Sequence, residues 1–132
     1  MENYKALVEK AKEAREYAYV PYSKFKVGAA LLTEDGKIYT GCNVENASYG
    51  ATNCAERTAI FKAVSEGTTC FKAIAIVSSS KDFTYPCGIC RQVIGEFMKQ
   101  GEIILENAEG EMKVYAFNDL LPYHFGKEEL NK

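Results

Sequence analysis

Apolar positions recur along the chain at two spacings, and each spacing predicts one kind of element. Three segments show the three- and four-residue spacing of amphipathic helices, and five show the short apolar or alternating runs of strands. The expected helices cover residues 4–18, 54–66 and 88–99. The expected strands cover residues 25–32, 37–42, 71–78, 102–106 and 112–117. Pro21, Gly67 and Gly101 follow the three helical segments and would end them.

The order of these elements predicts an α/β fold. A tight turn at Asp35-Gly36 favours a hairpin between the first two strands. Residues 107–111 are too few for a crossover helix, so the last two strands should be antiparallel. Residues 43–53 are small and polar, as in a loop. Without a repeat or linker to divide the chain, we expect a single domain over residues 1–132, a three-layer α/β/α fold with a mixed five-stranded sheet.

Charge and composition exclude several classes of protein. The 132 residues hold 16 Lys+Arg against 18 Asp+Glu, a net charge of −2, whereas nucleic-acid binding favours a basic face. No apolar run approaches the ~18 residues of a membrane span, and the first residues lack the apolar core of a signal peptide. We therefore expect a cytoplasmic protein without membrane or nucleic-acid partners. Five cysteines, an odd number, favour reduced thiols or a metal site over a disulfide framework.

Three of the cysteines lie where predicted helices begin. Cys54 opens one helix, and Pro86-Cys87-Gly88-Ile89-Cys90 opens the next. A Cys-x-x-Cys pair is either a redox pair, which leaves Cys54 without a role, or part of a zinc site. A structural zinc site usually has four protein ligands, and the single histidine, His124, lies far along the chain. Three thiolates with one open position are typical of a catalytic zinc, which lowers the pKa of bound water towards ~7.

A carboxylate accompanies these thiols. Glu56 follows Cys54 by two residues, at a helix N-terminus whose partial positive charge favours thiolates. A carboxylate beside an activated water can move protons. Taken singly, Cys54 could be a buried apolar residue and Glu56 a solvated residue of the first turn. Their combination with Pro-Cys-x-x-Cys favours a catalytic metal site.

The sequence resembles the small, zinc-dependent cytidine deaminases of nucleoside salvage over nearly its whole length. The matching segments are Pro21–Ala30, Gly41–Tyr49, Asn53–Ala59, Pro86–Val93 and Leu120–Pro122. Many members have histidine at the position that matches Cys54. With cysteine there, the sequence resembles the all-cysteine branch of the family, whose members are typically tetrameric. The resemblance implies a homotetramer with active sites shared between chains.

The resemblance also implies the reaction. Cys54, Cys87 and Cys90 would hold one Zn²⁺ per chain, with His124 uninvolved. Glu56 would take a proton from the attacking water, deliver it to N3 of the pyrimidine and help the amino group leave. The substrates would be cytidine and 2′-deoxycytidine, and the products the uridine nucleosides and ammonia. A deaminase of a cytosine-containing antibiotic of the blasticidin type is the alternative, but the run at residues 43–47 favours the nucleoside.

Five further residues match the substrate contacts of the family. Asn43 and Glu45 match the pair that binds the ribose 3′-hydroxyl, and Phe25 matches an aromatic that lines the pocket. The Ala55 backbone N–H would donate to pyrimidine O2. Phe125 is the candidate aromatic that stacks on the base from an adjacent subunit. Without the resemblance, Asn43 and Glu45 could be a solvated loop, Phe25 a core residue, and Phe125 a plug for its own domain.

Two polar residues have a separate electrostatic argument. Three thiolates and one Zn²⁺ carry a formal charge of −1, which opposes ionisation of a bound water. Donors aimed at the sulfurs would offset this charge. The family uses an arginine and a glutamine for this, at positions that match Arg57 and Gln92. Arg57 could otherwise be a surface charge. Cys42 and Cys70 are interpreted as small buried apolar residues.

Overall fold

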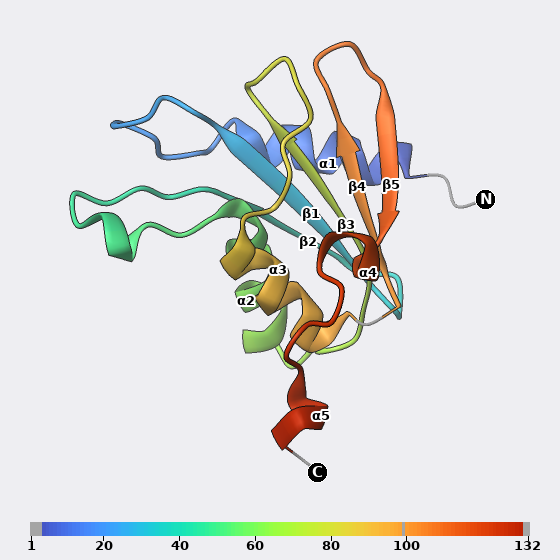
Figure 1. Cartoon of the computed structure of the whole chain (residues 1–132). Coiled ribbons are helices and arrows are strands. Elements are labelled where there is room, and N and C mark those ends of the chain that lie inside the picture. The colour runs from blue at the N-terminus through green and yellow to red at the C-terminus, as the bar shows by residue number, and fades with distance from the viewer. Residues whose placement is uncertain (1–3, 99, 131–132) are drawn as a thin grey trace.

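A mixed five-stranded sheet forms the middle of the molecule (Figure 1). The computed structural model of the chain describes residues 4–98 and 100–130. The strands are β1 (Val27–Thr33), β2 (Ile38–Cys42), β3 (Phe71–Ser78), β4 (Glu102–Glu106) and β5 (Met112–Ala116). Their order is β2-β1-β3-β4-β5; β3 and β4 run parallel, and the other neighbours antiparallel. The mixed sheet and the antiparallel last pair are as predicted.

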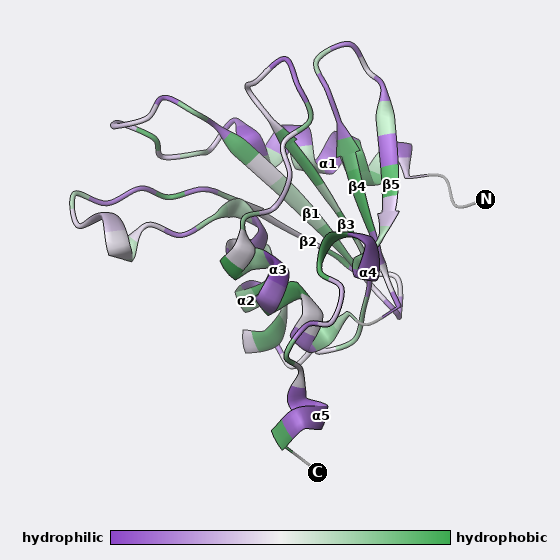
Figure 2. Ribbon diagram, in the orientation of Figure 1, coloured by the Kyte–Doolittle hydropathy of each residue, from purple (hydrophilic) through white to green (hydrophobic). Residues whose placement is uncertain are grey.

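Helices cover both faces of the sheet. α1 (Lys5–Arg15) lies on one face, and α2 (Ala55–Ser65) and α3 (Gly88–Phe97) lie on the other (Figure 1). Strongly hydrophobic segments of β3 and β4 lie between these layers (Figure 2). Buried apolar residues form one cluster on each side of the sheet, the larger one beneath α2 and α3. Burial of these two apolar faces is what holds the three predicted layers together.

Two glycines let helices approach the strands closely. A Cβ atom at Gly41 in β2 would lie 2.5 Å from the backbone nitrogen of Ala59 and 2.6 Å from the carbonyl oxygen of Ala55 in α2. A Cβ atom at Gly28 in β1 would meet the backbone of α1 in the same way. The contact at Gly41 fixes the first turn of α2, and therefore its N-cap, against the sheet.

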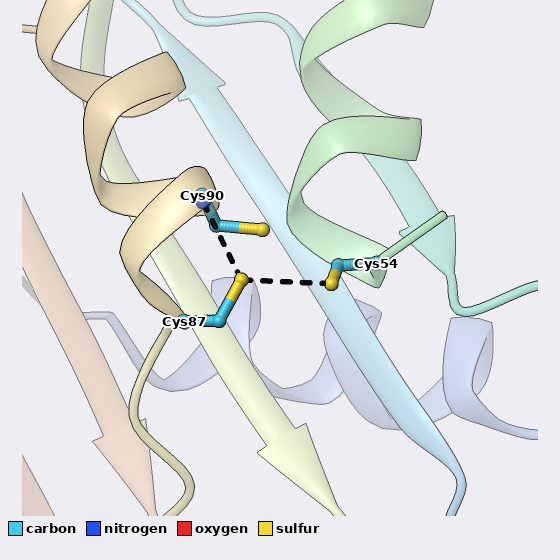
Figure 3. Close-up of side chains that lie close together, drawn as sticks. All are labelled: Cys54, Cys87 and Cys90. Atoms are coloured by element: carbon cyan, nitrogen blue, oxygen red, sulfur yellow. Dashed lines mark hydrogen bonds between the residues drawn. The ribbon is translucent and has the colours of Figure 1, made fainter. Parts of the chain in front are cut away.

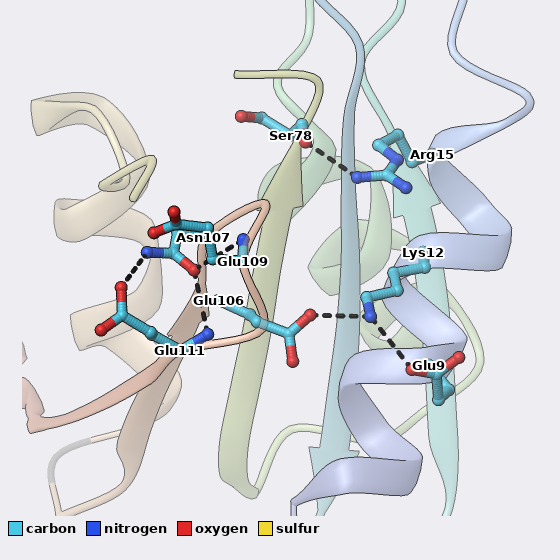
Figure 4. A network of polar contacts seen from close by, with 8 residues as sticks. All are labelled: Glu9, Lys12, Arg15, Ser78, Glu106, Asn107, Glu109 and Glu111. Atoms are coloured by element: carbon cyan, nitrogen blue, oxygen red, sulfur yellow. Dashed lines mark hydrogen bonds and ion pairs between the residues drawn. The ribbon is translucent and has the colours of Figure 1, made fainter. Parts of the chain in front are cut away.

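A polar network joins α1 to the carboxyl ends of β3 and β4 (Figure 4). The Lys12 ammonium lies 2.7 Å from a carboxylate oxygen of Glu106 and 3.1 Å from one of Glu9. Arg15 Nη1 donates to the carbonyl oxygen of Ser78 at 2.8 Å. These bonds anchor α1 on the face of the sheet opposite α2 and α3.

Element boundaries differ from the predictions at several places. α1 ends at Arg15 rather than at residue 18, because the backbone of Tyr19 pairs with Asn43 and Glu45. β1 begins at Val27, so Phe25 lies in the preceding loop. Within the predicted helix 88–99, residue 99 lies outside the described residues. No helix in the described part of the chain is long and apolar enough to cross a membrane.

Three short helices were not predicted. They are a 3-10 helix (Tyr49–Ala51) inside the predicted loop, α4 (Phe117–Leu120) and α5 (Lys127–Leu130). α4 begins where Asp119 Oδ2 accepts a hydrogen bond from the backbone nitrogen of Ala116, at 3.0 Å. Elements of three or four residues are too short to show a hydrophobic period, so the sequence pattern does not indicate them.

Candidate active site and metal centre

Cys54, Cys87 and Cys90 come together at the N-termini of two helices (Figure 3). Cys54 is the N-cap of α2, Cys87 is the N-cap of α3, and Cys90 lies in the first turn of α3. Their sulfur atoms all lie within 4.8 Å of one another, and those of Cys54 and Cys87 are 3.8 Å apart. The backbone nitrogen of Cys90 donates to the Cys87 sulfur at 3.5 Å. The structure therefore gathers the three predicted ligands.

This group of thiols fits a zinc ion. Two sulfurs on a tetrahedral zinc with Zn–S bonds of about 2.3 Å are separated by about 3.8 Å, which is the distance between Cys54 and Cys87. Hydrogen bonds from Cys90 and Arg57 lower the pKa of Cys54 to about 5 against the effect of burial, and zinc binds the thiolate form. Among the described residues this group consists of the three thiols; a catalytic zinc typically has three protein ligands and one open position.

Glu56 is buried beside these thiols. Its side chain belongs to the first turn of α2, and the residue is 4% exposed. Burial, together with the nearby negative charge of Cys54, raises the pKa of the Glu56 carboxyl to about 7. A carboxyl group that titrates near neutral pH can both accept and return a proton. This environment suits the predicted proton transfer.

Arg57 contacts the thiol group from the next position of the helix. Its Nη2 nitrogen donates to the Cys54 sulfur at 3.2 Å. Burial lowers the pKa of Arg57, but hydrogen bonds to Cys54 and Cys90 outweigh it and raise the pKa above its ordinary value. The Nε atom is buried and has no hydrogen-bond partner in the described part of the chain. The guanidinium of this partly buried residue thus contacts the thiol group through Nη2.

The Gln92 side chain contacts a backbone carbonyl in the C-terminal part of the chain. Its Nε2 nitrogen donates to the carbonyl oxygen of Phe125 at 2.6 Å. This hydrogen bond therefore holds the C-terminal segment (residues 117–125) against α3. Donation from Gln92 to a zinc thiolate stays a prediction.

Asn43 supports the segment that carries Phe25. Its Oδ1 atom accepts from the backbone nitrogen of Val27 at 2.9 Å, and its Nδ2 atom donates to the carbonyl oxygen of Phe25 at 2.8 Å. Phe25 is 39% exposed and is not a core residue. The side chain of Asn43 thus fixes the backbone of residues 25–27, and the Phe25 side chain lies at the surface.

Glu45 is held by the segment that precedes Phe25. Its carboxylate accepts from the backbone nitrogens of Tyr22 and Ser23 at 3.0 and 3.1 Å, and from the Ser23 hydroxyl. The Ser23 hydrogen bond lowers the pKa of Glu45 below its usual value. A hollow of about 390 Å³ lies here, lined by Tyr22, Ser23, Glu45, Asn46, Tyr49 and Thr52. Sequence reasoning missed Ser23 as a partner of Glu45, although both lie in the matching segments.

The remaining candidates, Ala55 and Phe125, differ in their exposure to solvent. Ala55 is the buried first residue of α2, where backbone N–H groups have no partner within the helix. Phe125 is 60% exposed, so it does not plug its own domain. His124 lies edge-on to Phe117, with ring centres 5.1 Å apart, and is not part of the thiol group.

The two other cysteines are not equally buried. Cys42 is partly buried, and burial raises the pKa of its thiol. Cys70 is exposed, so the prediction that it is buried was wrong. It directly precedes β3, and the apolar pattern of a strand does not extend to the residue before it.

Known proteins are similar to this chain in sequence and in fold. The model of the cytidine and deoxycytidylate deaminase zinc-binding region matches residues 1–106. A cytidine deaminase from Sporosarcina psychrophila is 55% identical over 126 residues, 95% of this chain and 93% of the relative. A crystal structure of cytidine deaminase from Burkholderia pseudomallei superposes with a TM-score of 0.89 at 53% identity, over 94% of this chain and 100% of that one. For the cytidine deaminase of Mycobacterium tuberculosis the TM-score is 0.83 at 40% identity, over 96% and 99%. The chain therefore belongs to the cytidine and deoxycytidylate deaminase family.

Proposed function

We propose that the chain, as a single domain over residues 1–132, hydrolyses cytidine and 2′-deoxycytidine to uridine and 2′-deoxyuridine with release of ammonia. The observation that carries the proposal is the group of three thiols with a buried carboxyl, Glu56, in the adjacent helical turn. The similarity to relatives named cytidine deaminase favours a nucleoside over a blasticidin-type antibiotic as substrate.

Glu56 carries the proton transfers. Cys54, Cys87 and Cys90 would hold one zinc ion, which when bound would supply Lewis-acid activation of a water molecule. Glu56 accepts a proton from this water while the water oxygen bonds to C4 of the pyrimidine. Glu56 then delivers that proton to N3. The proton of the new C4 hydroxyl then passes through Glu56 to the amino group, the C4–N4 bond breaks with its electron pair on nitrogen, and the C4 carbonyl of uridine forms. One water is consumed, and one ammonia is released.

Four residues contact the base and the ribose of the substrate. The Ala55 N–H donates to pyrimidine O2, Phe25 lines the base, and Glu45 with Asn43 binds the ribose 3′-hydroxyl. The hydrogen bonds from Tyr22 and Ser23 keep Glu45 ionised. A carboxylate at the sugar repels a phosphate group, so cytidine phosphates are poor substrates.

The active protein is a cytoplasmic homotetramer in which Phe125 of one chain stacks on the base in another. The exposure of the Phe125 ring supports this assignment, because an apolar ring of that size is free to enter a neighbouring site. Light scattering and activity, measured together on dilution, test it. A monomer with full activity would contradict the shared site.

The reaction itself is tested with the zinc-loaded protein and free cytidine. The absorbance band of cytidine should decrease, with uridine and ammonia formed in equal amounts. Parallel reactions contain CMP, a cytosine-containing single-stranded oligonucleotide, or blasticidin S. Efficient conversion of any of these, while cytidine is untouched, would refute the proposed substrate class.

A further inference from the structure

The Arg91 guanidinium spans two carbonyl groups from distant parts of the chain. Its Nε nitrogen donates to the carbonyl oxygen of Pro86 at 2.8 Å, and its Nη1 nitrogen donates to that of Leu120 at 2.7 Å. The residue is part-buried on α3, directly after the zinc-ligand candidate Cys90. Both bonds have the short length of charge-assisted hydrogen bonds.

Both acceptors lie at helix ends and are not used by the helices. Hydrogen bonding within α3 begins with the carbonyl oxygen of Cys87, which accepts from the Arg91 backbone nitrogen, so the preceding carbonyl of Pro86 has no helical partner. Leu120 is the last residue of α4, whose final carbonyls are equally without partners. Arg91 therefore links the residue before a zinc ligand to the start of the C-terminal segment.

Neighbouring residues of α3 strengthen this link. Gln92 holds the carbonyl oxygen of Phe125. Gly95, one turn later, has no side chain where Phe117 and His124 approach; a Cβ atom there would lie 2.6 Å from the Phe117 ring. One face of α3 thus binds the C-terminal segment, while the start of the same helix carries Cys87 and Cys90.

We propose that Arg91 is a positioning residue that couples the metal site to the C-terminal segment carrying Phe125. The bond to Leu120 holds the guanidinium in place, and the bond to Pro86 then fixes the backbone next to Cys87. The position of the Cys87 sulfur therefore depends on Leu120 being packed against α3. The inference rests on the proposed zinc site and adds a residue that acts through the ligand rather than on it. Since coupling is reciprocal, loss of zinc should loosen the C-terminal segment.

Substitution of Arg91 by lysine tests the role of its two hydrogen bonds. Arg91→Lys keeps the charge but places all donors on one nitrogen, which cannot replace the two separate nitrogens that donate to the carbonyls of Pro86 and Leu120. Arg15→Lys is the matched control, because Arg15 also donates to a backbone carbonyl, that of Ser78, on the opposite face of the sheet. Zinc release from each loaded protein is followed with a chromophoric chelator. We expect release about tenfold faster from Arg91→Lys, as for other residues that orient metal ligands, and within twofold of wild type from Arg15→Lys.

A second measurement uses the wild-type protein. Hydrogen exchange of residues 117–125 is compared with zinc bound and after zinc removal. Faster exchange of this segment after removal supports the coupling, and in Arg91→Lys the exchange should be fast in both states. Unchanged exchange in wild type, or equal zinc release from the two lysine variants, would overturn the inference. A wild-type protein that takes up no zinc would instead refute the metal site on which it rests.

Discussion

The Nη2 nitrogen of Arg57 lies 3.2 Å from the sulfur of Cys54, three residues earlier at the start of the same helix. A cation in direct contact with one thiol of a three-thiol group offsets negative charge at the place where it accumulates. The same contact orients the sulfur towards Cys87 and Cys90.

Replacement of this cation should impair the site without emptying it. We expect Arg57→Gln to retain zinc and to lose about 10- to 100-fold in kcat, because the charge of three thiolates is then poorly compensated. Zinc content and kcat are measured on the same preparation. Arg15→Gln, in α1, should keep wild-type kcat; an equal loss in both variants would show a general effect on stability instead.

Glu56→Gln should separate catalysis from folding. Glutamine has the size of glutamate but cannot accept the proton of the attacking water. Since Glu56 serves several successive proton transfers, kcat should fall by ~10⁴-fold or more, at or beyond the upper end of what one acid–base group contributes. Zinc content should be unchanged, and the melting temperature should not fall, because a buried carboxyl is replaced by a neutral amide.

The same substitution at the other end of α2 provides the control for this experiment. Glu66 is the exposed C-cap of the helix, and Glu66→Gln should leave kcat unchanged. Turnover of Glu56→Gln within a few-fold of wild type would remove Glu56 from the mechanism.

Gly41→Ala tests whether the close approach of α2 to β2 positions the metal site. The added Cβ atom would meet backbone atoms of Ala55 and Ala59, which cannot rotate away, so α2 must shift. We expect a loss of about 3 kcal/mol in unfolding free energy and faster zinc release. Gly50→Ala, where the Cβ atom meets nothing within 4 Å, should cost far less. Denaturant unfolding of both variants decides; equal losses would contradict the role of the contact.

Lys12→Met should destabilise the protein in a pH-dependent way. Hydrogen bonds from Lys12 to Glu106 and Glu9 raise its pKa, and the substitution leaves the Glu106 carboxylate, 10% exposed, without this partner. Because Lys12 is partly exposed, we expect a loss of only about 1 kcal/mol at neutral pH. A raised pKa stabilises the fold below the ordinary value of 10.5, and this contribution is lost as pH rises through the folded-state pKa.

Urea unfolding at pH 7 and above pH 10.5 checks this dependence. The difference between wild type and Lys12→Met should shrink at the higher pH. Lys10→Met is the control, since Lys10 lies 3.8 Å from Glu13 and both side chains are more than half exposed. A control that loses as much stability as Lys12→Met would contradict the assigned role of Glu106.

Local signals in the sequence were enough to select the candidate residues of the site. Cys54, Glu56 and the Cys-x-x-Cys pair each lie at the start of a helix, and the start of a helix is set by residues that are near in sequence. The layers also followed from local patterns, because a buried helix face and a buried strand each have a characteristic period. These features were predictable without knowledge of distant contacts.

Distant contacts decided the rest. Cys54 and Cys87 are 33 residues apart, and they meet because α2 and α3 pack on the same face of the sheet. The direction of Gln92 towards Phe125 and the exposure of Cys70 depend likewise on which segments dock beside them.

The sequence by itself therefore determined the candidate residues of the site, and the tertiary structure decided which of them touch and what holds them there. Arg91 illustrates the division: its place after Cys90 is visible in the sequence, but its bonds to Pro86 and Leu120 are not. Hydrophobic period reports whether a residue faces the core. It does not report the partner of a polar side chain, since that partner is a backbone group brought close only when separate elements pack.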